Sequence, residues 1–187
     1  IKFEGAICYP LGRLDRGFGE FILTHPDLRI PDGTREIAVN ASSERLWDPP
    51  VKRYVTECMA GHGGPRGADY TTRWIASPVA ELHRLLLRGG MLLYPRDVEA
   101  PEEPGFLRLL GQADAMAMLV EQAGGVASTG RARILDVTPQ ALGQRVPVYL
   151  GTGAEVERIE RYHQEHDAGL DVPFESPLFR DRSLFNG

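Results

Sequence analysis

The chain has 187 residues, of which 42% are hydrophobic and 25% charged, and its formal net charge is −5. This length suits one α/β domain with a sizeable core, and the composition is ordinary for a globular protein. The acidic balance argues against a nucleic-acid partner, which needs a basic face, and no apolar run approaches the roughly 20 residues of a membrane span.

Three stretches within the first 39 residues are expected to form strands. The start of the chain, residues 1–9, alternates weakly between apolar and polar types and predicts a strand, and it shows no signal-peptide pattern. We therefore expect a cytoplasmic protein with no membrane partner. The stretches 18–24 and 36–39 predict two further strands.

A turn from Asn40 to Ser43 lies between the last of these strands and a helix. Its Asn and Ser side chains can bond loop amides or phosphate oxygens, so the turn is either structural or a phosphate contact. Asp48 and Pro49 predict the start of the helix. Cys58 and Met59 fall on its apolar stripe, which indicates that the thiol belongs to the core and is not a nucleophile.

The stretch from Arg73 to Tyr94 is expected to be the organising unit of the chain. Ser77 is a natural N-cap and Pro78 suits the first helical position, so a helix is predicted to begin here. Gly89 and the glycine after it predict its end, because glycine adopts the left-handed conformation that stops a helix.

The buried face of this helix is predicted to carry Val79, Leu82, His83 and Leu86, which are spaced i, i+3, i+4 and i+7. The following stretch, residues 91–94, is too short for a helix and predicts a buried strand. The polar aromatic ends of the unit, at residues 73–74 and 94, mark the place where a small anionic ligand could be held.

The second half of the chain continues the alternation of strands and helices. Helices are predicted over 114–123 and from a capping box at 152–155 to about residue 166. Strands are predicted over 107–110, 126–127, 134–137 and 146–150. Residues 1–166 should form one α/β domain with a mixed sheet flanked by helices, and residues 167–187 an extended C-terminal arm.

Several long blocks of this sequence resemble class I fructose-1,6-bisphosphatase. They include WDPPVKRYVTEC, RWIASPVAELHRLLLRGGMLLYPRD and MLVEQAGGVASTGR, which occur in one colinear order. The resemblance is to the C-terminal half of the family, in its bacterial branch. It covers essentially the whole chain, including the tail SPLFRDRSLF.

The resemblance implies a layered fold and a hydrolase of carbohydrate metabolism. The family releases the 1-phosphate of fructose 1,6-bisphosphate in gluconeogenesis or the Calvin cycle, uses Mg²⁺, and forms homotetramers built from dimers. Its N-terminal half supplies most of the metal ligands. This chain is therefore expected to supply the half that binds the sugar and its 6-phosphate, and to be incomplete for catalysis alone.

The resemblance also implies the residues that bind substrate. Asn40 and Tyr94 match phosphate-binding residues of the family, and Arg73 matches an Arg that reaches into the site of the neighbouring subunit. Trp74 and Ser43 stand where many members carry a phosphate-binding Tyr. No catalytic residue is expected in this half.

Two further positions depart from the family pattern. Phe106 stands where the family has a Lys or Arg that holds the substrate, and Gln112 stands where it has a metal-binding Glu. Mg²⁺ favours anionic carboxylate oxygens, so an amide should hold the metal weakly. The alternative interpretation is therefore a catalytically silent sugar-phosphate-binding or assembly module derived from the family.

Overall fold

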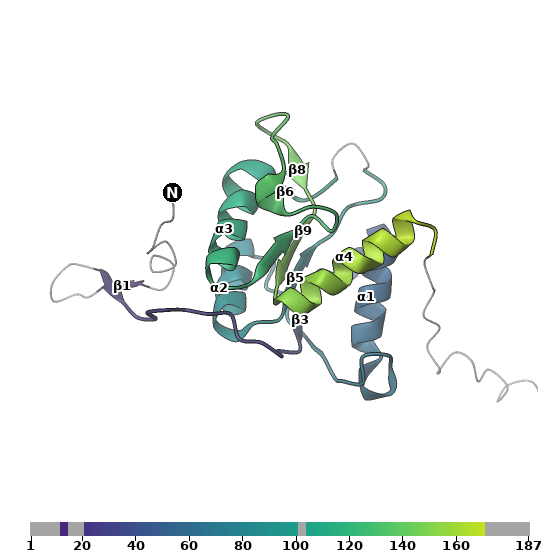
Figure 1. The fold of residues 1–187 in the computed structure, drawn as a ribbon, viewed down its shortest axis with the longest axis horizontal. Coiled ribbons are helices and arrows are strands. Elements are labelled where there is room, and N and C mark those ends of the chain that lie inside the picture. Colours follow the sequence, from purple (N-terminus) through teal and green to yellow (C-terminus); the bar gives the residue numbers. More distant parts are fainter. Residues whose placement is uncertain (1–11, 15–20, 101–103, 171–187) are drawn as a thin grey trace, which may run out of the picture.

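The computed structural model of the protein describes residues 12–14, 21–100 and 104–170 (Figure 1). Its centre is a five-stranded sheet in the order β4-β3-β5-β9-β7. β3 is parallel to β4 and β5, whereas β9 is antiparallel to β5 and β7. The strands are β3 (Glu36–Ala38), β4 (Thr71–Thr72), β5 (Met91–Tyr94), β7 (Val126–Ser128) and β9 (Val148–Gly151).

Four α-helices cover the two faces of this sheet. α2 and α3 pack on one face, and α1 and α4 pack on the other (Figure 1). The helices are α1 (Pro49–Met59), α2 (Pro78–Arg88), α3 (Asp114–Gln122) and α4 (Gly153–Asp167). The predicted α/β class, with a mixed sheet flanked by helices, is confirmed.

The central strand β5 is buried on both sides. Met91 and Leu93 point into the core beneath α1 and α4, while Leu92 and Tyr94 point into the core beneath α2 and α3. Successive side chains of a strand face opposite ways, so a strand covered on both faces must be apolar throughout. This burial on both faces explains the continuous run of apolar residues that predicted the strand.

Two short antiparallel pairs accompany the central sheet. β1 (Gly12–Leu14) pairs with β2 (Phe21–Leu23), and β6 (Leu107–Arg108) pairs with β8 (Arg145–Val146). The predicted strand 18–24 is thus described only from residue 21, where it is confirmed over β2. The predicted strand 1–9 and most of the predicted arm, from residue 171, lie outside the described residues.

Three strand predictions after residue 100 need correction. The predicted strand 107–110 ends after β6, because the chain enters a π-helix (Leu109–Ala113) broken by Gly111, whose φ is 78°. Residues 134–136 form a 3-10 helix instead of a strand. The predicted strand 146–150 is divided between β8 and β9 at Pro147, which has no N–H to donate to a ladder.

The ends of α2 are confirmed, and so is the burial of Leu82 and Leu86, but the other two residues of the predicted face are exposed. Ser77 accepts a hydrogen bond from the backbone N of Ala80, and Gly89 follows the helix with a φ of 76°. Val79 is 76% exposed and His83 is also exposed. Glu81 and Leu85 are buried beside Leu82 and Leu86 in their place. One of these positions holds the buried carboxylate of Glu81, so a prediction based only on the spacing of apolar residues misplaced part of the buried face.

The layer of α1 and α4 contains a buried polar cluster. Arg66, in the loop after α1, has a side chain only 3% exposed and binds Glu155 at 2.5 Å. Glu155 also accepts hydrogen bonds from the hydroxyls of Tyr54 and Tyr70. Although burial opposes the effect, these hydrogen bonds lower the pKa of Glu155. The capping box predicted at the start of α4 does not form, because Thr152 makes no side-chain cap and Glu155 is engaged here.

Cys58 lies beneath this cluster and is 1% exposed. Burial raises the pKa of its thiol to about 12, so the thiolate that a nucleophile requires is suppressed. The prediction that Cys58 is a core residue is confirmed, whereas Met59, placed on the same stripe, is 66% exposed and does not belong to the core.

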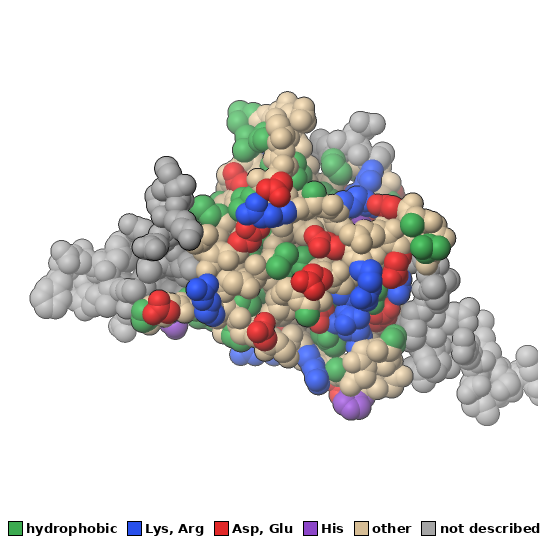
Figure 2. All heavy atoms as spheres, viewed as in Figure 1, with side chains coloured by type: hydrophobic (Ala, Val, Ile, Leu, Met, Phe, Trp, Pro, Cys, Tyr) green, Lys and Arg blue, Asp and Glu red, His purple; other side chains and the backbone are tan. Residues whose placement is uncertain are grey.

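The surface of the domain carries both signs of charge. On the face shown in Figure 2, acidic and basic side chains are interspersed, with Lys and Arg most concentrated over α1 and α4. Among the described residues, no helix has both the length and the apolar character needed to cross a membrane.

Candidate functional site

The candidate site lies at the edge of the sheet where three parallel strands end. Asn40 follows β3, Trp74 follows β4, and Tyr94 is the last residue of β5. Because these strands are parallel, their carboxyl ends meet at the same edge. The topology therefore brings together three residues that are up to 54 positions apart in the sequence.

A cleft of about 430 Å³ opens at this edge. The β6–β8 pair closes one side of it, through Phe106 before β6 and Arg145 at the start of β8. Gly105 allows this approach, since a Cβ there would collide with the backbone of Val146. The lining residues are Asn40, Ser43, Leu46, Trp47, Trp74, Ala76, Leu93, Tyr94, Pro95, Arg96, Asp97, Ala100, Gly105, Phe106 and Arg145.

Three aromatic rings form one wall of the cleft. The Trp74 and Tyr94 rings lie 5.3 Å apart at 55°, and the Tyr94 and Phe106 rings are stacked at 5.8 Å and 15°. Phe106 is 64% exposed and Tyr94 is 5% exposed. Phe106 thus places a solvent-exposed aromatic ring at the position where the family resemblance implies a Lys or Arg.

The hydroxyl of Tyr94 is buried and has no hydrogen-bond partner among the described residues. Burial, assisted by the nearby carboxylate of Glu81, raises the pKa of Tyr94 to about 12. An unpaired buried hydroxyl costs free energy that a ligand or a water molecule can recover. The ring is therefore held by its aromatic neighbours, while its hydroxyl is left without a partner among the described residues.

The Asn40 turn is ordered by its own side chains. The Asn40 amide donates to Ser43 Oγ at 3.0 Å and accepts from Ser42 Oγ at 2.7 Å. The second amide hydrogen and the Ser43 hydroxyl hydrogen are not used in these bonds. The two alternatives for this turn are thus compatible, since the same residues can order the loop and present donors to the cleft.

The cleft also contains charged side chains that sequence reasoning missed. Arg96 and Arg145 contribute cations, and Asp97 contributes a carboxylate. The backbone carbonyl of Phe106 accepts a hydrogen bond from Arg145 Nη1 at 3.0 Å. None of these residues belongs to a recognisable sequence motif. Only the pairing of β6 with β8 brings Arg145 to the end of β5.

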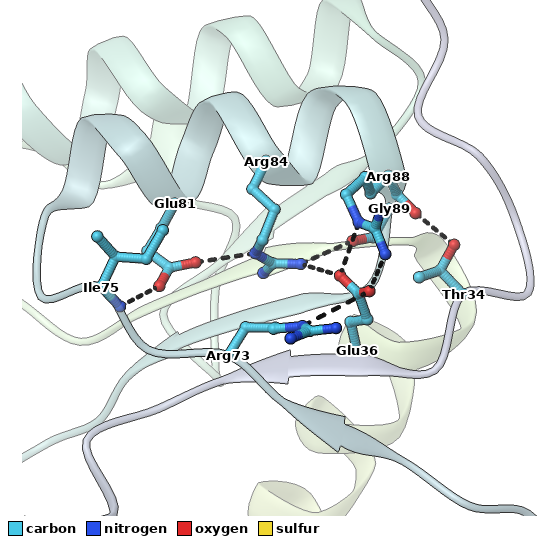
Figure 3. Close-up of polar contacts among 8 residues, drawn as sticks. All are labelled: Thr34, Glu36, Arg73, Ile75, Glu81, Arg84, Arg88 and Gly89. Carbon is cyan, nitrogen blue, oxygen red and sulfur yellow. Dashed lines mark hydrogen bonds and ion pairs between the residues drawn. The ribbon is translucent and has the colours of Figure 1, made fainter.

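Arg73 does not line this cleft. Its backbone N donates to Ile37 O at 2.7 Å, so it extends the pairing of β4 with β3. Side chains alternate along such an extended segment, and while Trp74 faces the cleft, Arg73 points toward Glu36, with 3.8 Å between Nε and Oε1 (Figure 3). The Arg73 side chain is 51% exposed.

Glu36 belongs to a network that joins β3 to α2 (Figure 3). Arg84 donates to Glu36 at 3.0 Å and to Glu81 at 2.9 Å, and Arg88 also binds Glu36. The Arg88 hydrogen bond is the main cause that lowers the pKa of Glu36, against the opposing effect of burial. Glu81 is fully buried and also accepts a 2.7 Å hydrogen bond from the backbone N of Ile75.

The bond from Ile75 fixes the segment that carries Trp74. Ala76 follows with a φ of 59°, a left-handed conformation that costs a non-glycine residue roughly 1 kcal/mol or more. The network around α2 holds this turn, which places Ala76 and Trp74 on the lining of the cleft.

Gln112 lies away from the lining residues, in the π-helix after β6. Its Oε1 accepts a 2.9 Å hydrogen bond from the backbone N of Arg108. The amide oxygen therefore serves a backbone donor and carries no charge to attract a divalent cation. The described residues contain no group of three or more His, Cys, Asp or Glu side chains that could hold a metal ion.

The cleft offers amide, hydroxyl and guanidinium donors beside an aromatic wall. Guanidinium groups bind phosphate oxygens through two parallel hydrogen bonds, and aromatic rings cover the apolar face of an organic ligand. The arrangement suits a small anion attached to a carbon skeleton. Five of the predicted substrate-binding positions meet here: Asn40, Ser43, Trp74, Tyr94 and Phe106.

Comparisons with known proteins agree on one family. Residues 30–164 match the family described as fructose-1-6-bisphosphatase, C-terminal domain. Two curated relatives are named fructose-1,6-bisphosphatase class 1. The protein from Methylacidiphilum infernorum is 57% identical over 172 residues, covering 92% of this chain and 48% of its own length. The protein from Hydrogenophilus thermoluteolus is 55% identical, covering 92% and 47%.

A solved structure is also similar. The crystal structure of Leishmania major fructose-1,6-bisphosphatase in holo form superimposes with a TM-score of 0.74 at 40% sequence identity. The match covers 82% of this chain and 45% of that protein. The chain thus spans about half the length of the relatives it matches.

Proposed function

Because the chain belongs to the fructose-1,6-bisphosphatase family, whose C-terminal domain it matches, we propose that it forms the sugar-phosphate-binding half of such an enzyme. Its sequence resemblance to class I members is confirmed. The proposed reaction of the complete enzyme is hydrolysis of fructose 1,6-bisphosphate to fructose 6-phosphate and phosphate. The proposed location is the cytoplasm.

The observation that carries this proposal is the cleft at the carboxyl ends of β3, β4 and β5. Asn40, Trp74 and Tyr94 meet there with two arginines, although they come from separate strands. Asn40 and Tyr94 are proposed to bind the 6-phosphate, through the Asn40 amide and the free Tyr94 hydroxyl. We expect roughly millimolar affinity for fructose 6-phosphate, a binding free energy of about 4 kcal/mol.

The described residues do not fit the Mg²⁺ ions that the family resemblance implies. Gln112 is a neutral amide bonded to Arg108 N, and no acidic cluster stands beside it. We therefore assign no reaction step through a metal to this chain. In the complete enzyme, the metal ligands would come from the other half.

A phosphatase assay tests this division. The 187-residue chain is incubated with fructose 1,6-bisphosphate and Mg²⁺, alone and mixed with the N-terminal half of a relative. Phosphate release is expected only in the mixture, because this chain supplies binding and the other half supplies the metal ligands. Turnover by the chain alone would show that the division is wrong.

A second candidate function is a catalytically silent binding or assembly module. The stacking of Phe106 on Tyr94 and the bonded amide of Gln112 favour it, because neither side chain contributes charge. The double variant Phe106→Arg with Gln112→Glu, joined to an N-terminal half, should raise phosphate release if these two residues limit activity. No increase would favour the silent module.

Arg73 leads us to propose a homo-oligomer, either a dimer or a tetramer. Its guanidinium points away from the cleft of its own chain and is half-exposed beside Glu36. From this exposed position, beside Glu36, it could contact the cleft of a neighbouring copy. Light scattering at high protein concentration should give at least a dimeric mass, and a strictly monomeric mass would contradict the proposal.

A further inference from the structure

The cleft needs a source of positive charge if it is to bind a phosphate group. Phe106 supplies none, and Arg73 points away from this cleft. The cations that line it are Arg96 and Arg145. They come from different parts of the chain, since Arg96 follows β5 by one proline and Arg145 begins β8.

Arg96 differs from three other partly buried arginines of the domain, each of which is paired with a carboxylate. Arg66 is bound to Glu155, Arg84 to Glu36 and Glu81, and Arg53 to Glu57 and Glu165. No described residue forms a hydrogen bond or an ion pair with the side chain of Arg96, although Arg96 is partly buried. A guanidinium without a counter-ion at the wall of a cleft attracts an anion.

The neighbours of Arg96 favour a specific kind of anion. Tyr94, two residues earlier, presents a buried hydroxyl without a partner, and Phe106 presents an exposed ring stacked on Tyr94. A phosphate group can use the guanidinium and the hydroxyl, while the carbon skeleton that carries it can lie against the aromatic wall. Arg145 adds a second positive charge on the side of Phe106.

We propose that Arg96 is the principal phosphate-binding side chain of this cleft, with Arg145 as the second cation. Arg96 supplies the positive charge that Phe106 lacks. The ligand class is a phosphate monoester of a small polyol, and this identification of the carbon skeleton rests on the proposed function. The phosphate contact itself rests only on the surroundings of Arg96.

Isothermal titration of the 187-residue chain tests this assignment. The probes are fructose 6-phosphate, fructose and inorganic phosphate. Arg96→Gln should weaken binding of fructose 6-phosphate roughly tenfold or more, because a hydrogen-bonded charge is lost. Arg96→Lys should retain part of the affinity. The matched control is Arg35→Gln, which removes an exposed arginine outside the cleft and should leave binding unchanged.

Thermal unfolding of each variant checks that the fold is intact, and no loss is expected for Arg96→Gln, whose side chain has no partner to lose among the described residues. Unchanged fructose 6-phosphate binding by Arg96→Gln would overturn the assignment and leave the proposed function standing. Binding of inorganic phosphate that depends on Arg96, with no added affinity for fructose 6-phosphate, would support the assignment and remove the sugar phosphate from the proposed function. Absence of binding by every probe at concentrations well above millimolar would overturn both.

Discussion

Arg84, on α2, and Arg96, after β5, have opposite surroundings. Arg84 lies between the carboxylates of Glu36 and Glu81 and joins β3 to α2 (Figure 3). Arg96 lines a cleft and has no counter-ion among the described residues. Breaking a buried ion pair leaves an uncompensated charge in the interior, whereas removing an unpaired cation beside solvent leaves nothing behind. Arg84 should therefore serve stability, and Arg96 should serve binding.

The largest effect expected from this contrast is on stability. Glu81→Ala should lower the free energy of unfolding by about 3 kcal/mol, because Arg84 Nε and the backbone N of Ile75 both lose their acceptor in a buried place. Urea denaturation measures the loss. Glu44→Ala removes an exposed carboxylate and should change the free energy by no more than about 0.5 kcal/mol. A loss below about 1 kcal/mol for Glu81→Ala would contradict the role of the network.

The second effect concerns the cleft. Phe106→Arg should raise the affinity for fructose 6-phosphate roughly tenfold, because a third guanidinium joins Arg96 and Arg145. Leu142→Arg adds the same charge at an 84% exposed position outside the cleft and should not change the affinity. Titration calorimetry compares the two variants, and an equal gain in both would mean that net charge alone attracts the ligand.

The third effect is a pH dependence that arises from Tyr94. Its pKa is raised from 10.0 to about 12 in the folded chain. Ionisation of Tyr94 does not affect the free energy of unfolding below pH 10, but it lowers it as the pH rises toward 12, because the unfolded chain releases its proton first. Tyr94→Phe removes the unpaired buried hydroxyl and should be more stable than the original chain at pH 7. Its advantage should grow above pH 10, by up to about 1 kcal/mol per pH unit.

Denaturation curves of both proteins at several pH values between 9 and 11.5 measure this difference. Other buried tyrosines titrate in both proteins, so only the difference between them reports on Tyr94. A constant difference over this range would mean that Tyr94 is not shifted as described.

The smallest effect is expected at Arg73. Its 3.8 Å contact with Glu36 is half-exposed, so Arg73→Ala should lower the free energy of unfolding by less than about 0.5 kcal/mol. Its effect on fructose 6-phosphate binding should appear only at protein concentrations where the chain self-associates. Loss of binding in a monomeric sample would place Arg73 in the cleft of its own chain.

Local sequence signals predicted the central part of the fold well. Ser77, Pro78 and Gly89 marked the ends of α2 because caps and stops depend on the residues themselves. The continuous apolar sequence of β5 predicted a strand because both of its faces are covered. Half of the predicted face of α2 was wrong because Glu81 is buried with Arg84 and the backbone N of Ile75 as its partners, and the periodicity of apolar residues cannot show this.

The candidate site was only partly predictable. Asn40 and Tyr94 were singled out as possible anion contacts from the sequence and then through the family resemblance, and the structure explains their proximity by the shared edge of parallel strands. Arg96 was missed because its significance depends on the absence of a counter-ion among the described residues, and Arg145 was missed because only the pairing of β6 with β8 brings it to the cleft. Both properties exist only in the folded chain.

The buried Arg66 has a consequence for protease digestion. The loop from Gly61 to Gly67 contains four glycines and a trypsin recognition residue, and such a loop is ordinarily cut early. Trypsin must take the arginine side chain into its specificity pocket, yet Arg66 is enclosed by Tyr54 and Glu155. Cleavage after Arg66 should therefore require that the loop first separate from α4, so the appearance of this fragment would report the opening of the α1–α4 layer.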